Sequence, residues 1–512
     1  MYNMGSISLM FIATFFVHAA RSDKDVDRYM KFPADFKLGI STASYQIEGA
    51  WNVSDKGESV WDRFTHQRPS PIRDASDGDV ACDSYNKYKE DIEILKDLGV
   101  DGYRISLSWT RILPGGFPNK VSEDGIRYYK NLLENLKAQG IEPVVCIYHW
   151  DHPVVLEEMG GWTNELMVTW FADYARVVFN HLGDHIKTYV TLNEVADNCK
   201  QAYGSGDKAP GKTMPEIAPY LCVHNMLKAH AKVYHMYADE YRSQQNGIIG
   251  IVLQCMSYYP KYQNDTETPE VFFDFNCGWM LDPLFSENGG YPAVMKERIG
   301  ENSKLEGYPK SRLPEFTEEE IDYIRGSADF IGLNHYTSVL TEPALKSNDE
   351  TLWYQDHGVI RSYNESWPRT ASSWLRVVPQ GFGDLLRKLK NRYNNPAVYV
   401  LENGIADLGT SLQDTERIQY LHDYIREMLL AINRDNCNVK TYFIWSLLDN
   451  FEWESGYSER FGLVNIDFNN FNRSRTPKLS YNWYKQLIST RQLSPIENLK
   501  SSNTTYSVHV LH

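Results

Sequence analysis

Short apolar runs that are typical of buried strands recur eight times in this chain, and stretches with helical periodicity separate them. An apolar, partly β-branched run of about four to eight residues between turn signals favours a fully buried strand. Strands that alternate with helices favour parallel β/α units. The predicted strands span residues 36–42, 102–107, 142–148, 188–193, 247–254, 330–334, 397–402 and 440–445. The predicted helices span residues 85–98, 122–139, 163–181, 217–242, 415–433 and 480–488.

The count of eight, and the polar residues that gather at the strand C-termini, predict an α/β fold that closes into a (β/α)8 TIM barrel. Active sites of such barrels lie at the C-terminal ends of the strands. Segments 256–329 and 337–381 are too long for simple connections, so we expect them to be loop insertions on the catalytic face. A chain of 512 residues fits one barrel with insertions. We therefore expect a single barrel domain over 21–495 and a polar tail over 496–512.

Residues 1–20 have most features of a signal peptide. Residues 7–17 are apolar, Ala19 and Ala20 are small, and a charged stretch begins at Arg21. The segment before the apolar run lacks Lys and Arg, which departs from the usual pattern. The apolar run is too short to cross a bilayer, so we expect a secreted, soluble chain with no membrane partner. Five Asn-x-Ser/Thr glycosylation acceptors fit this route, at Asn52, Asn264, Asn364, Asn472 and Asn503.

The chain contains seven cysteines, whose pairing depends on the compartment of the protein. They are Cys82, Cys146, Cys199, Cys222, Cys255, Cys277 and Cys437. An odd number leaves at least one free thiol in the absence of an intermolecular bridge. Their spacing contains no Cys-x-x-Cys metal site. Cys199 and Cys222 are candidates for a disulfide, and we expect most of the others to be small buried apolar residues.

The composition excludes one class of partner. The formal net charge of −15 disfavours nucleic acid, because phosphate binding needs a basic surface. The chain also contains 34 Tyr and 13 Trp. These aromatic side chains either fill a large core or offer faces on which sugars stack, and composition does not separate the two. Nothing in the composition indicates an oligomeric state.

Two glutamates stand at the ends of predicted strands. Glu402 ends the strand at 397–402 and precedes the turn dipeptide Asn403-Gly404, and Glu194 directly follows the strand at 188–193. A carboxylate at the tip of a buried strand is costly unless it is paired or functional. Glycoside hydrolysis with retention needs two carboxyl groups about 5–5.5 Å apart. We therefore expect the pair to face each other across one pocket, although either one alone would suit a surface loop or a helix N-cap.

The neighbours of the two glutamates predict different protonation states. Arg104, near the end of the second strand, would keep Glu402 charged, and Tyr336 would donate its hydroxyl to the same carboxylate. Glu194 has the neutral Asn193 beside it, so its nearest strong charge would be ionised Glu402. That charge would raise the pKa of Glu194 and make it the general acid.

Other strand ends offer groups that hold sugar hydroxyls or stack on sugar rings. Gln46 and Glu48 follow the first strand, and Trp445 ends the eighth, with Glu452 and Trp453 seven residues on. After the third strand come His149, Trp150 and Asp151. His149, Asp151 and His152 also suggest a metal cluster, but no further ligand lies nearby in the sequence. We therefore expect neither a metal nor another cofactor.

Several strings together resemble family-one glycoside hydrolases, the β-glucosidase family, from about residue 32 to 490. They are FKLGISTASYQIEGAW at 36–51, YRISLSWTRILP at 103–114, YHWDHP at 148–153, TLNE at 191–194, IGLNHYTS at 331–338, LENG at 401–404 and WSLLDNFEWESGYSERFGL at 445–463. The resemblance implies a retaining β-glycosidase with Glu402 as the nucleophile and Glu194 as the acid/base. The sugar subsite that it implies comprises Gln46, His149, Asn193, Glu402, Glu452 and Trp453, with Trp445 as its floor. It also implies that Arg104, Asn334 and Tyr336 support the nucleophile.

The resemblance also bears on the substrate. Relatives that act on 6-phosphosugars usually carry Ser at the position of Glu452, so a neutral hexose is implied. Val195 stands where the family usually has Pro, and Leu401 where it usually has Thr; both departures keep the carboxylates. The implied substrate is a β-D-glucoside of a small, plant-derived aglycone.

Two types of linkage between glucose and the aglycone, through oxygen or through sulfur, fit the sequence. Plant thioglucosidases of the family typically replace the acid/base Glu by Gln, whereas insect-type thioglucosidases (myrosinases) keep both glutamates, as this chain does. Lys200 is either a solvated loop residue or a cation that binds the anionic aglycone of a glucosinolate. A second cation expected near Val339 is absent from the sequence. A non-catalytic glycoside-binding protein on the same barrel is the remaining alternative.

Overall fold

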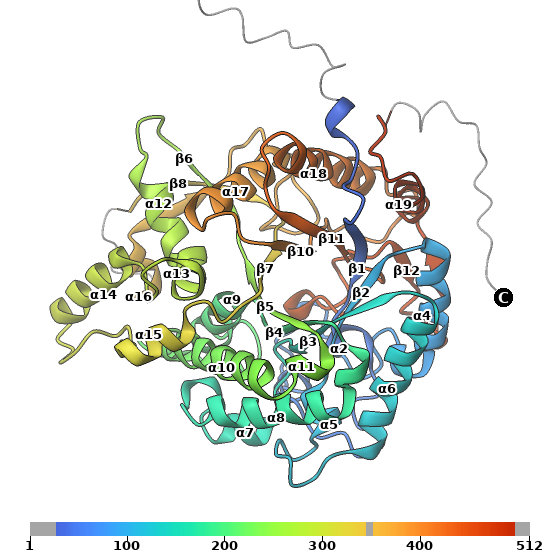
Figure 1. The fold of residues 1–512 in the computed structure, drawn as a ribbon, viewed down its shortest axis with the longest axis horizontal. Helices are drawn as coiled ribbons and strands as arrows, with labels where there is room; N and C mark the ends of the chain where they lie inside the picture. The colour runs from blue at the N-terminus through green and yellow to red at the C-terminus, as the bar shows by residue number, and fades with distance from the viewer. Residues whose placement is uncertain (1–26, 345–351, 497–512) are drawn as a thin grey trace, which may run out of the picture.

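The computed structural model describes residues 27–344 and 352–496, and its core is a closed parallel barrel surrounded by helices (Figure 1). The barrel strands are β1 (Lys37–Ser41), β2 (Gly102–Ser106), β3 (Glu142–Tyr148), β4 (Thr188–Asn193), β5 (Ile248–Gln254), β7 (Phe330–Asn334), β10 (Val398–Glu402) and β11 (Val439–Trp445). They pair in the order β1-β11-β10-β7-β5-β4-β3-β2, and β1 also pairs with β2, which closes the barrel. The predicted (β/α)8 barrel is confirmed.

Long helices cover the outside of the barrel. They are α4 (Ser84–Leu98), α6 (Glu123–Ala138), α8 (Met167–Leu182), α10 (Ala218–Glu240), α17 (Pro379–Arg392), α18 (Thr415–Asn433) and α19 (Leu479–Thr490). Shorter helices lie in the connections: α2 (Ser44–Ile47), α3 (Val60–Thr65), α5 (Trp109–Ile112), α7 (Val154–Glu158), α9 (Val195–Cys199) and α11 (Arg242–Gln245). None of the helices in the described part of the chain is long and apolar enough to span a membrane.

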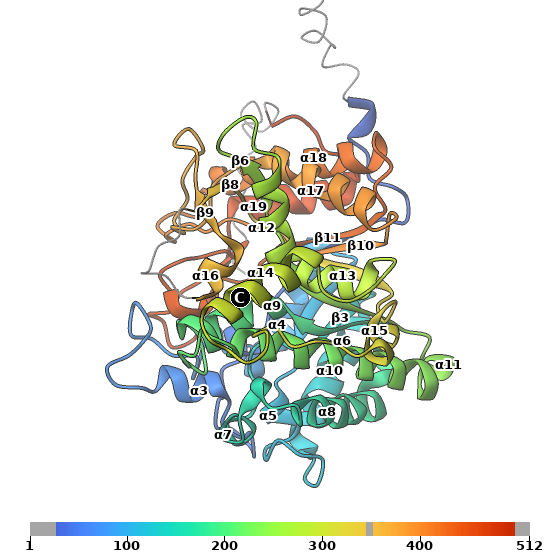
Figure 2. The ribbon, with the colours of Figure 1, turned by 90° about the vertical axis from the view of Figure 1, so that its left-hand side faces the viewer.

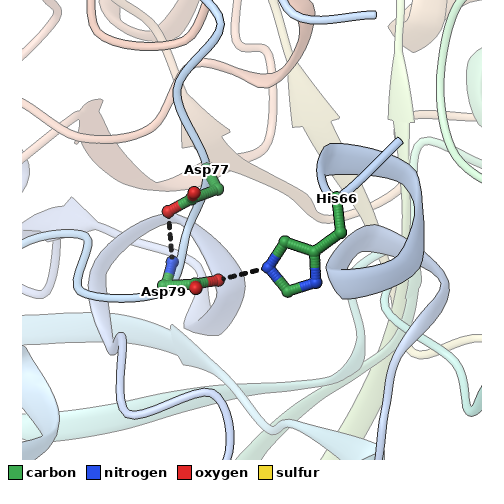
Figure 3. A group of neighbouring side chains, drawn as sticks. All are labelled: His66, Asp77 and Asp79. Carbon is green, nitrogen blue, oxygen red and sulfur yellow. Dashed lines mark hydrogen bonds and ion pairs between the residues drawn. The ribbon is translucent and has the colours of Figure 1, made fainter. Parts of the chain in front are cut away.

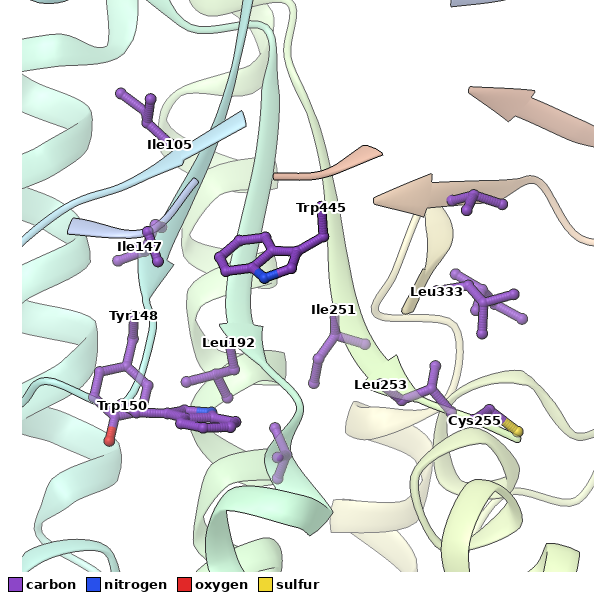
Figure 4. Close-up of a cluster of buried hydrophobic side chains, with 14 of the residues drawn as sticks. Ile105, Ile147, Tyr148, Trp150, Leu192, Ile251, Leu253, Cys255, Leu333 and Trp445 are labelled. Atoms are coloured by element: carbon purple, nitrogen blue, oxygen red, sulfur yellow. The ribbon is translucent and has the colours of Figure 1, made fainter. Parts of the chain in front are cut away.

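Alternate residues of each strand serve two layers of the core. Val144 and Cys146 of β3 point into the barrel, where they pack with Val190, Val252 and Phe443. The intervening residues point outward, because successive side chains of a strand face opposite sides. Figure 4 includes four residues of this outer layer, Ile105, Ile147, Ile251 and Leu333, from β2, β3, β5 and β7. Apolar packing on both sides explains why the strands read as continuous apolar runs in the sequence.

The two long insertions have secondary structure of their own. The first contains β6 (Ser257–Pro260), α12 (Glu267–Phe273), α13 (Trp279–Phe285), α14 (Ala293–Leu305) and α15 (Glu318–Ile324), and the second contains β8 (Ser338–Pro343), α16 (Leu352–His357) and β9 (Val359–Ser362). β6 pairs with β8 in parallel and β8 pairs with β9 in antiparallel fashion, so one small sheet joins the two insertions (Figure 2). A further pair, β12 (Val464–Ile466) and β13 (Arg475–Pro477), follows the barrel.

Two disulfides are present. Cys199–Cys222 joins α9 to α10, as the sequence suggested. Cys255–Cys277 joins the end of β5 to the first insertion, a pairing that the sequence did not suggest. The other three cysteines confirm that most of the remaining five are small buried residues. Cys82, Cys146 and Cys437 are buried free thiols.

The predicted surface and terminal features lie partly outside the described residues. Asn52, Asn264, Asn364 and Asn472 are exposed, whereas the acceptor at Asn503, the leader at 1–20 and all but the first residue of the tail at 496–512 fall outside the described part of the chain.

Candidate active site

A cavity of about 390 Å³ opens at the C-terminal ends of the barrel strands. Among its lining residues are both predicted catalytic glutamates, Glu194 and Glu402. Five more of the predicted sugar-binding residues also line it: His149, Trp150, Trp445, Glu452 and Trp453. Side chains from separate strands of the barrel therefore meet in one cavity, as the fold requires of an active site.

Glu402 is the last residue of β10 and is held at both carboxylate oxygens. The guanidinium of Arg104, which is fully buried on β2, donates to Oε1. The hydroxyl of Tyr336 donates to Oε2 at 2.6 Å. Burial and the charge of Glu402 raise the pKa of Tyr336, so its hydroxyl keeps its proton and stays a donor. These two contacts match the prediction for Arg104 and Tyr336, and they favour an ionised Glu402.

Glu194 caps α9 and occupies a different environment. Its backbone N–H donates to the carbonyl of Val252 at 2.8 Å, and the amide of Asn334 donates to its Oε1 at 2.7 Å. Burial is the largest cause that raises the pKa of Glu194, and the charge of Glu402 follows; together they raise it to about 8. This carboxyl group therefore holds a proton near neutral pH.

Asn334, which the resemblance expects to support the nucleophile, lies opposite Glu402 in the register of β7 with β10. Its side-chain amide donates to Glu194 and to Asn193, and not to Glu402 itself. The reason is geometric: β7 pairs with both β5 and β10, so the tip of β7 lies between the two glutamates.

Asn193 connects the two glutamates to the sugar-binding side of the cavity. Its Oδ1 accepts from Arg104 at 2.6 Å, which fixes its Nδ2 as the donor to Nε2 of His149 at 3.1 Å. Burial, and then the charge of Arg104, lower the pKa of His149, so the ring is neutral with its proton on Nδ1. That Nδ1 is buried and has no hydrogen-bond partner among the described residues. A buried donor in this state is suited to a polar ligand.

Gln46 does not line the cavity, but it too has a buried polar atom without a partner among the described residues. Its Nε2 donates to Asn450 Oδ1 and to the carbonyl of Phe451, each at 2.9 Å. Its Oε1 is buried and has no partner among the described residues, so it remains available as an acceptor. Glu48 and Asp151, also expected to bind sugar, do not line the cavity. Glu48 pairs with Arg111 at 2.9 Å, and Asp151 accepts from Ser44 at 2.9 Å, so both serve the surrounding structure.

Aromatic rings form one side of the cavity. The ring of Trp453 lies 4.7 Å from that of Trp150 and 5.8 Å from that of His149, measured between centroids. Trp445 Nε1 lies 3.5 Å from Glu452 Oε2. Glu194, Trp150 and Trp453 all have positive φ, at 46°, 74° and 50°. Non-glycine residues adopt this region at a cost, and such residues cluster at functional sites.

A metal site does not form from the histidines after β3. His149, Asp151 and His152 each bond to different partners; His152 contacts Tyr148 at 3.0 Å and Glu157 at 3.0 Å. Within the described ranges, one group could offer three ligand atoms within 4.8 Å of one another: His66, Asp77 and Asp79 (Figure 3). His66 Nε2 already bonds to Asp79 at 2.8 Å, and none of the three lines the cavity.

The rest of the cavity comes largely from residues that the sequence did not single out. Tyr258 of β6, Val339 of β8 and Arg361 of β9 line it, so the small sheet of the insertions forms a wall. Trp374, Phe461 and Phe272 add aromatic surface, and Lys208 adds a cation. Lys200 lines the cavity as predicted; its Nζ contacts Asn276 at 2.9 Å and Asp197 at 3.1 Å. The insertions lack strong hydrophobic periodicity, so only their length indicated in the sequence that they help to form the active-site cavity.

Comparison with known proteins agrees with this geometry. The family model described as glycosyl hydrolase family 1 matches residues 28–493. Myrosinase 1 of Brevicoryne brassicae is 44% identical over 464 residues, which is 90% of this chain and 99% of that protein. Human lactase/phlorizin hydrolase is 44% identical over 92% of this chain but only 24% of its own length.

Solved structures agree as well. The structure of aphid myrosinase superposes with a TM-score of 0.87 at 43% identity, over 91% of this chain and 100% of that chain. A β-glucosidase from Humicola insolens in complex with glucose gives a TM-score of 0.84 at 37% identity, over 90% of this chain and 99% of that chain. The barrel, the match of the family model and these identities lead to one conclusion: the chain is a glycoside hydrolase and belongs to glycosyl hydrolase family 1.

Proposed function

We propose that this enzyme is a retaining β-glycosidase that hydrolyses β-D-glucosides of small, plant-derived aglycones by double displacement. The observation that carries the proposal is the pair of buried carboxyl groups, Glu194 and Glu402, which line one cavity with unlike partners. Retaining glycosidases need one carboxylate that is ionised and one that is protonated. The contacts of Arg104 and Tyr336 support the first role for Glu402, and the raised pKa supports the second for Glu194.

In the first step, Glu402 attacks the anomeric carbon while Glu194 gives its proton to the departing aglycone. Loss of this proton leaves Glu194 as a carboxylate. In the second step, that carboxylate takes a proton from water, and the water oxygen displaces Glu402 from the sugar. Two inversions at one carbon give net retention. Neither step needs a metal or another cofactor.

The sugar is held by groups that have spare hydrogen-bonding capacity. His149 Nδ1 is a buried donor and Gln46 Oε1 a buried acceptor, and neither has a partner among the described residues. We assign both to sugar hydroxyls, together with Glu452, while Trp453 and Trp445 contact the ring. Asn193 orients His149, and we assign it to the same sugar subsite. The aromatic side chains Phe272, Trp374 and Phe461 then suit an apolar or aromatic aglycone.

A second candidate function is the hydrolysis of thioglucosides with an anionic aglycone. Lys200 lines the cavity, and the structure adds Arg361 on the same wall. Burial is the largest cause that lowers the pKa of the nearby His357, and the positive charges of Lys200 and Arg361 follow; together they lower it to about 3. A neutral histidine beside two cations leaves this wall positively charged, although Asp197 offsets Lys200. The 44% identity to an aphid protein named Myrosinase 1 supports the same reading.

We also propose that the protein is secreted and glycosylated. The leader pattern at 1–20, four exposed Asn-x-Ser/Thr acceptors and two disulfides support this route. Disulfides persist in oxidising compartments and are rare in the cytosol.

Removing either glutamate separates the two steps. Glu194→Ala should still release a good leaving group such as dinitrophenol, because that departure needs no acid. The glycosyl-enzyme should then accumulate, and azide should attack it to give a β-glucosyl azide. Glu402→Gln should lose at least about 100-fold in turnover, with no rescue by azide. Nuclear magnetic resonance of the product decides the outcome. An α-azide, or normal turnover by Glu402→Gln, contradicts the assignment, and an inactive wild type favours a glycoside-binding protein.

The pH dependence of kcat/KM should respond to the charge of Asp197. This charge is the third-largest cause that raises the pKa of Glu194, after burial and the charge of Glu402. Glu194 must be protonated in the first step, so kcat/KM should fall as pH rises through about 8. In Asp197→Asn the pKa of Glu194 falls, and the alkaline limb should move to lower pH. Asp207→Asn is the control, because Asp207 also lines the cavity but is not among the groups that shift Glu194. An unmoved limb contradicts the role of Glu194.

Lys200→Met and Arg361→Met test the anionic aglycone. Each should raise KM for a glucosinolate by about tenfold while changing KM for a neutral aryl glucoside by less than about twofold, since a lost charge contact is worth about 1–2 kcal/mol. Lys261→Met is the control, because Lys261 follows β6 but pairs with Glu342 outside the cavity. Equal effects on both substrates remove the cations from substrate recognition.

Mass spectrometry tests the secretory route. Protein from the medium of expressing insect cells should begin near residue 21 and lose glycan mass on treatment with an N-glycanase. Alkylation in denaturant without reductant should label three cysteines, those found as free thiols. Retention of the full-length chain inside the cells contradicts secretion, and five labelled cysteines contradict one of the disulfides.

A further inference from the structure

Glu459 is a buried carboxylate on the cavity wall that the proposed reaction does not use. It follows the turn that carries Glu452 and Trp453, it lines the cavity, and it is only 4% exposed. A buried carboxylate needs hydrogen-bond donors around it, because an unpaired buried charge is costly. The donors that surround Glu459 therefore indicate what this residue does.

Three side chains from three loops donate to this carboxylate. Arg73, between α3 and α4, and Ser455, in the turn after β11, both donate to Oε1, at 2.8 Å and 3.1 Å. Ser372, in the second insertion, donates to Oε2. Hydrogen bonds to an ionised acceptor are stronger than bonds between neutral groups. Glu459 therefore links loops that are distant in the sequence.

The contact with Ser372 is the one that no other hydrogen bond duplicates. The loop of Arg73 is also bound through its backbone, because the N–H of Arg73 donates to the carbonyl of Glu454 at 2.9 Å. Ser372 is fully buried. Within the described ranges, its bond to Glu459 is the only hydrogen bond between the second insertion and the turn 452–459. Loss of this bond should therefore let the two segments move independently.

Trp374 lies two residues beyond Ser372 and reaches the cavity. Its ring lines the cavity and meets the ring of Tyr336 edge to face, with 5.5 Å between the centroids. Tyr336 in turn donates to Glu402 at 2.6 Å. The bond between Glu459 and Ser372 therefore holds the segment that places an aromatic ring beside the residue that supports the nucleophile.

We propose that Glu459 is a positioning residue for the aglycone, which acts by holding Ser372 and thereby the ring of Trp374. Because Glu459 follows the turn with Glu452 and Trp453, the link fixes the aglycone wall relative to the sugar-binding wall. The inference rests on the proposed function and deepens it. An apolar or aromatic aglycone that lies beside Trp374 gains affinity from the link, whereas free glucose does not.

Binding to an enzyme that cannot turn over tests the link directly. In a Glu402→Gln background, Ser372→Ala should weaken the binding of an aryl β-glucoside by about tenfold, because a charge-assisted hydrogen bond no longer holds the segment of Trp374. Binding of glucose should change by less than about twofold, because glucose has no aglycone. Isothermal titration calorimetry measures both. Glu365→Ala is the control, because Glu365 lies in the same insertion, is exposed and does not line the cavity.

Turnover separates the two steps. Ser372→Ala and Glu459→Ala should each lower kcat/KM for an aryl β-glucoside by about tenfold. Where release of the sugar from Glu402 limits turnover, as equal kcat for several activated aryl glucosides would show, kcat should change by less than about twofold, because the aglycone has already left. Glu459→Gln, whose side-chain amide can still bond to Ser372, should recover most of the loss.

Double variants show whether the effect passes through the named residues. In a Glu459→Ala background, Ser372→Ala should change kcat/KM by less than about twofold, and the same should hold in a Trp374→Ala background. If Glu459→Ala is not folded by circular dichroism, Ser372→Ala, which removes a single oxygen atom, takes its place and is compared with and without Trp374.

Three results overturn the inference: unchanged binding of the aryl glucoside by Ser372→Ala, equal weakening for glucose and the aryl glucoside, and a loss that persists in full without Trp374. The second result would make Glu459 a general support of the fold. A wild type that hydrolyses no β-glucoside contradicts the proposed function, while selective weakening of aryl-glucoside binding by Ser372→Ala still supports the inference.

Discussion

The buried ion pair between Arg104 and Glu402 is the interaction on which the site depends. Arg104 is fully buried in the barrel, and a charge in that position is tolerated only with a well-placed partner. One end of its guanidinium meets Glu402, and another meets Asn193 at 2.6 Å. Asn193 in turn fixes the tautomer of His149 and contacts Asn334, which reaches Glu194. A single cation thus orders both glutamates and one wall of the sugar subsite.

The barrel supplies the geometry that this network needs. Arg104, Asn193, Asn334 and Glu402 come from four different strands, β2, β4, β7 and β10. Parallel strands bring their C-terminal ends to the same rim, so residues that are distant in the chain become neighbours. Apolar layers inside and outside the strands hold this rim in place. Gly404 allows β10 and β11 to approach closely, since a Cβ there would lie 2.0 Å from the carbonyl oxygen of Trp445.

Much of this arrangement could be predicted from the sequence, because buried parallel strands and strand-end carboxylates leave strong local signals. The eight strands, the cavity positions of Glu194 and Glu402, and the contacts of Arg104 and Tyr336 follow from such signals. The hydrogen bond from Asn334 to Glu194 could not be predicted, because the choice of this amide between two glutamates depends on how the strands pair, which local sequence does not encode. Two contacts of the insertions could not be predicted: the Cys255–Cys277 disulfide and the pairing of β6 with β8. Hydrophobic periodicity reports local secondary structure and does not show which distant segments lie side by side. Lys208 lies on a loop and Arg361 on the short strand β9, where composition alone does not distinguish a solvated cation from one that lines the cavity.

The small sheet of β6, β8 and β9 forms one wall of the cavity but does not hold the catalytic glutamates. Its strands carry Tyr258, Val339 and Arg361 to the cavity but none of the groups that contact Glu402. One edge of it is tethered near Cys255 at the end of β5, and the remainder is built from excursions of the chain beyond the barrel. Substitutions in these excursions can therefore change the shape and charge of one cavity wall while the contacts that hold Glu402 stay intact, so the range of accepted ligands can diverge without rebuilding the catalyst.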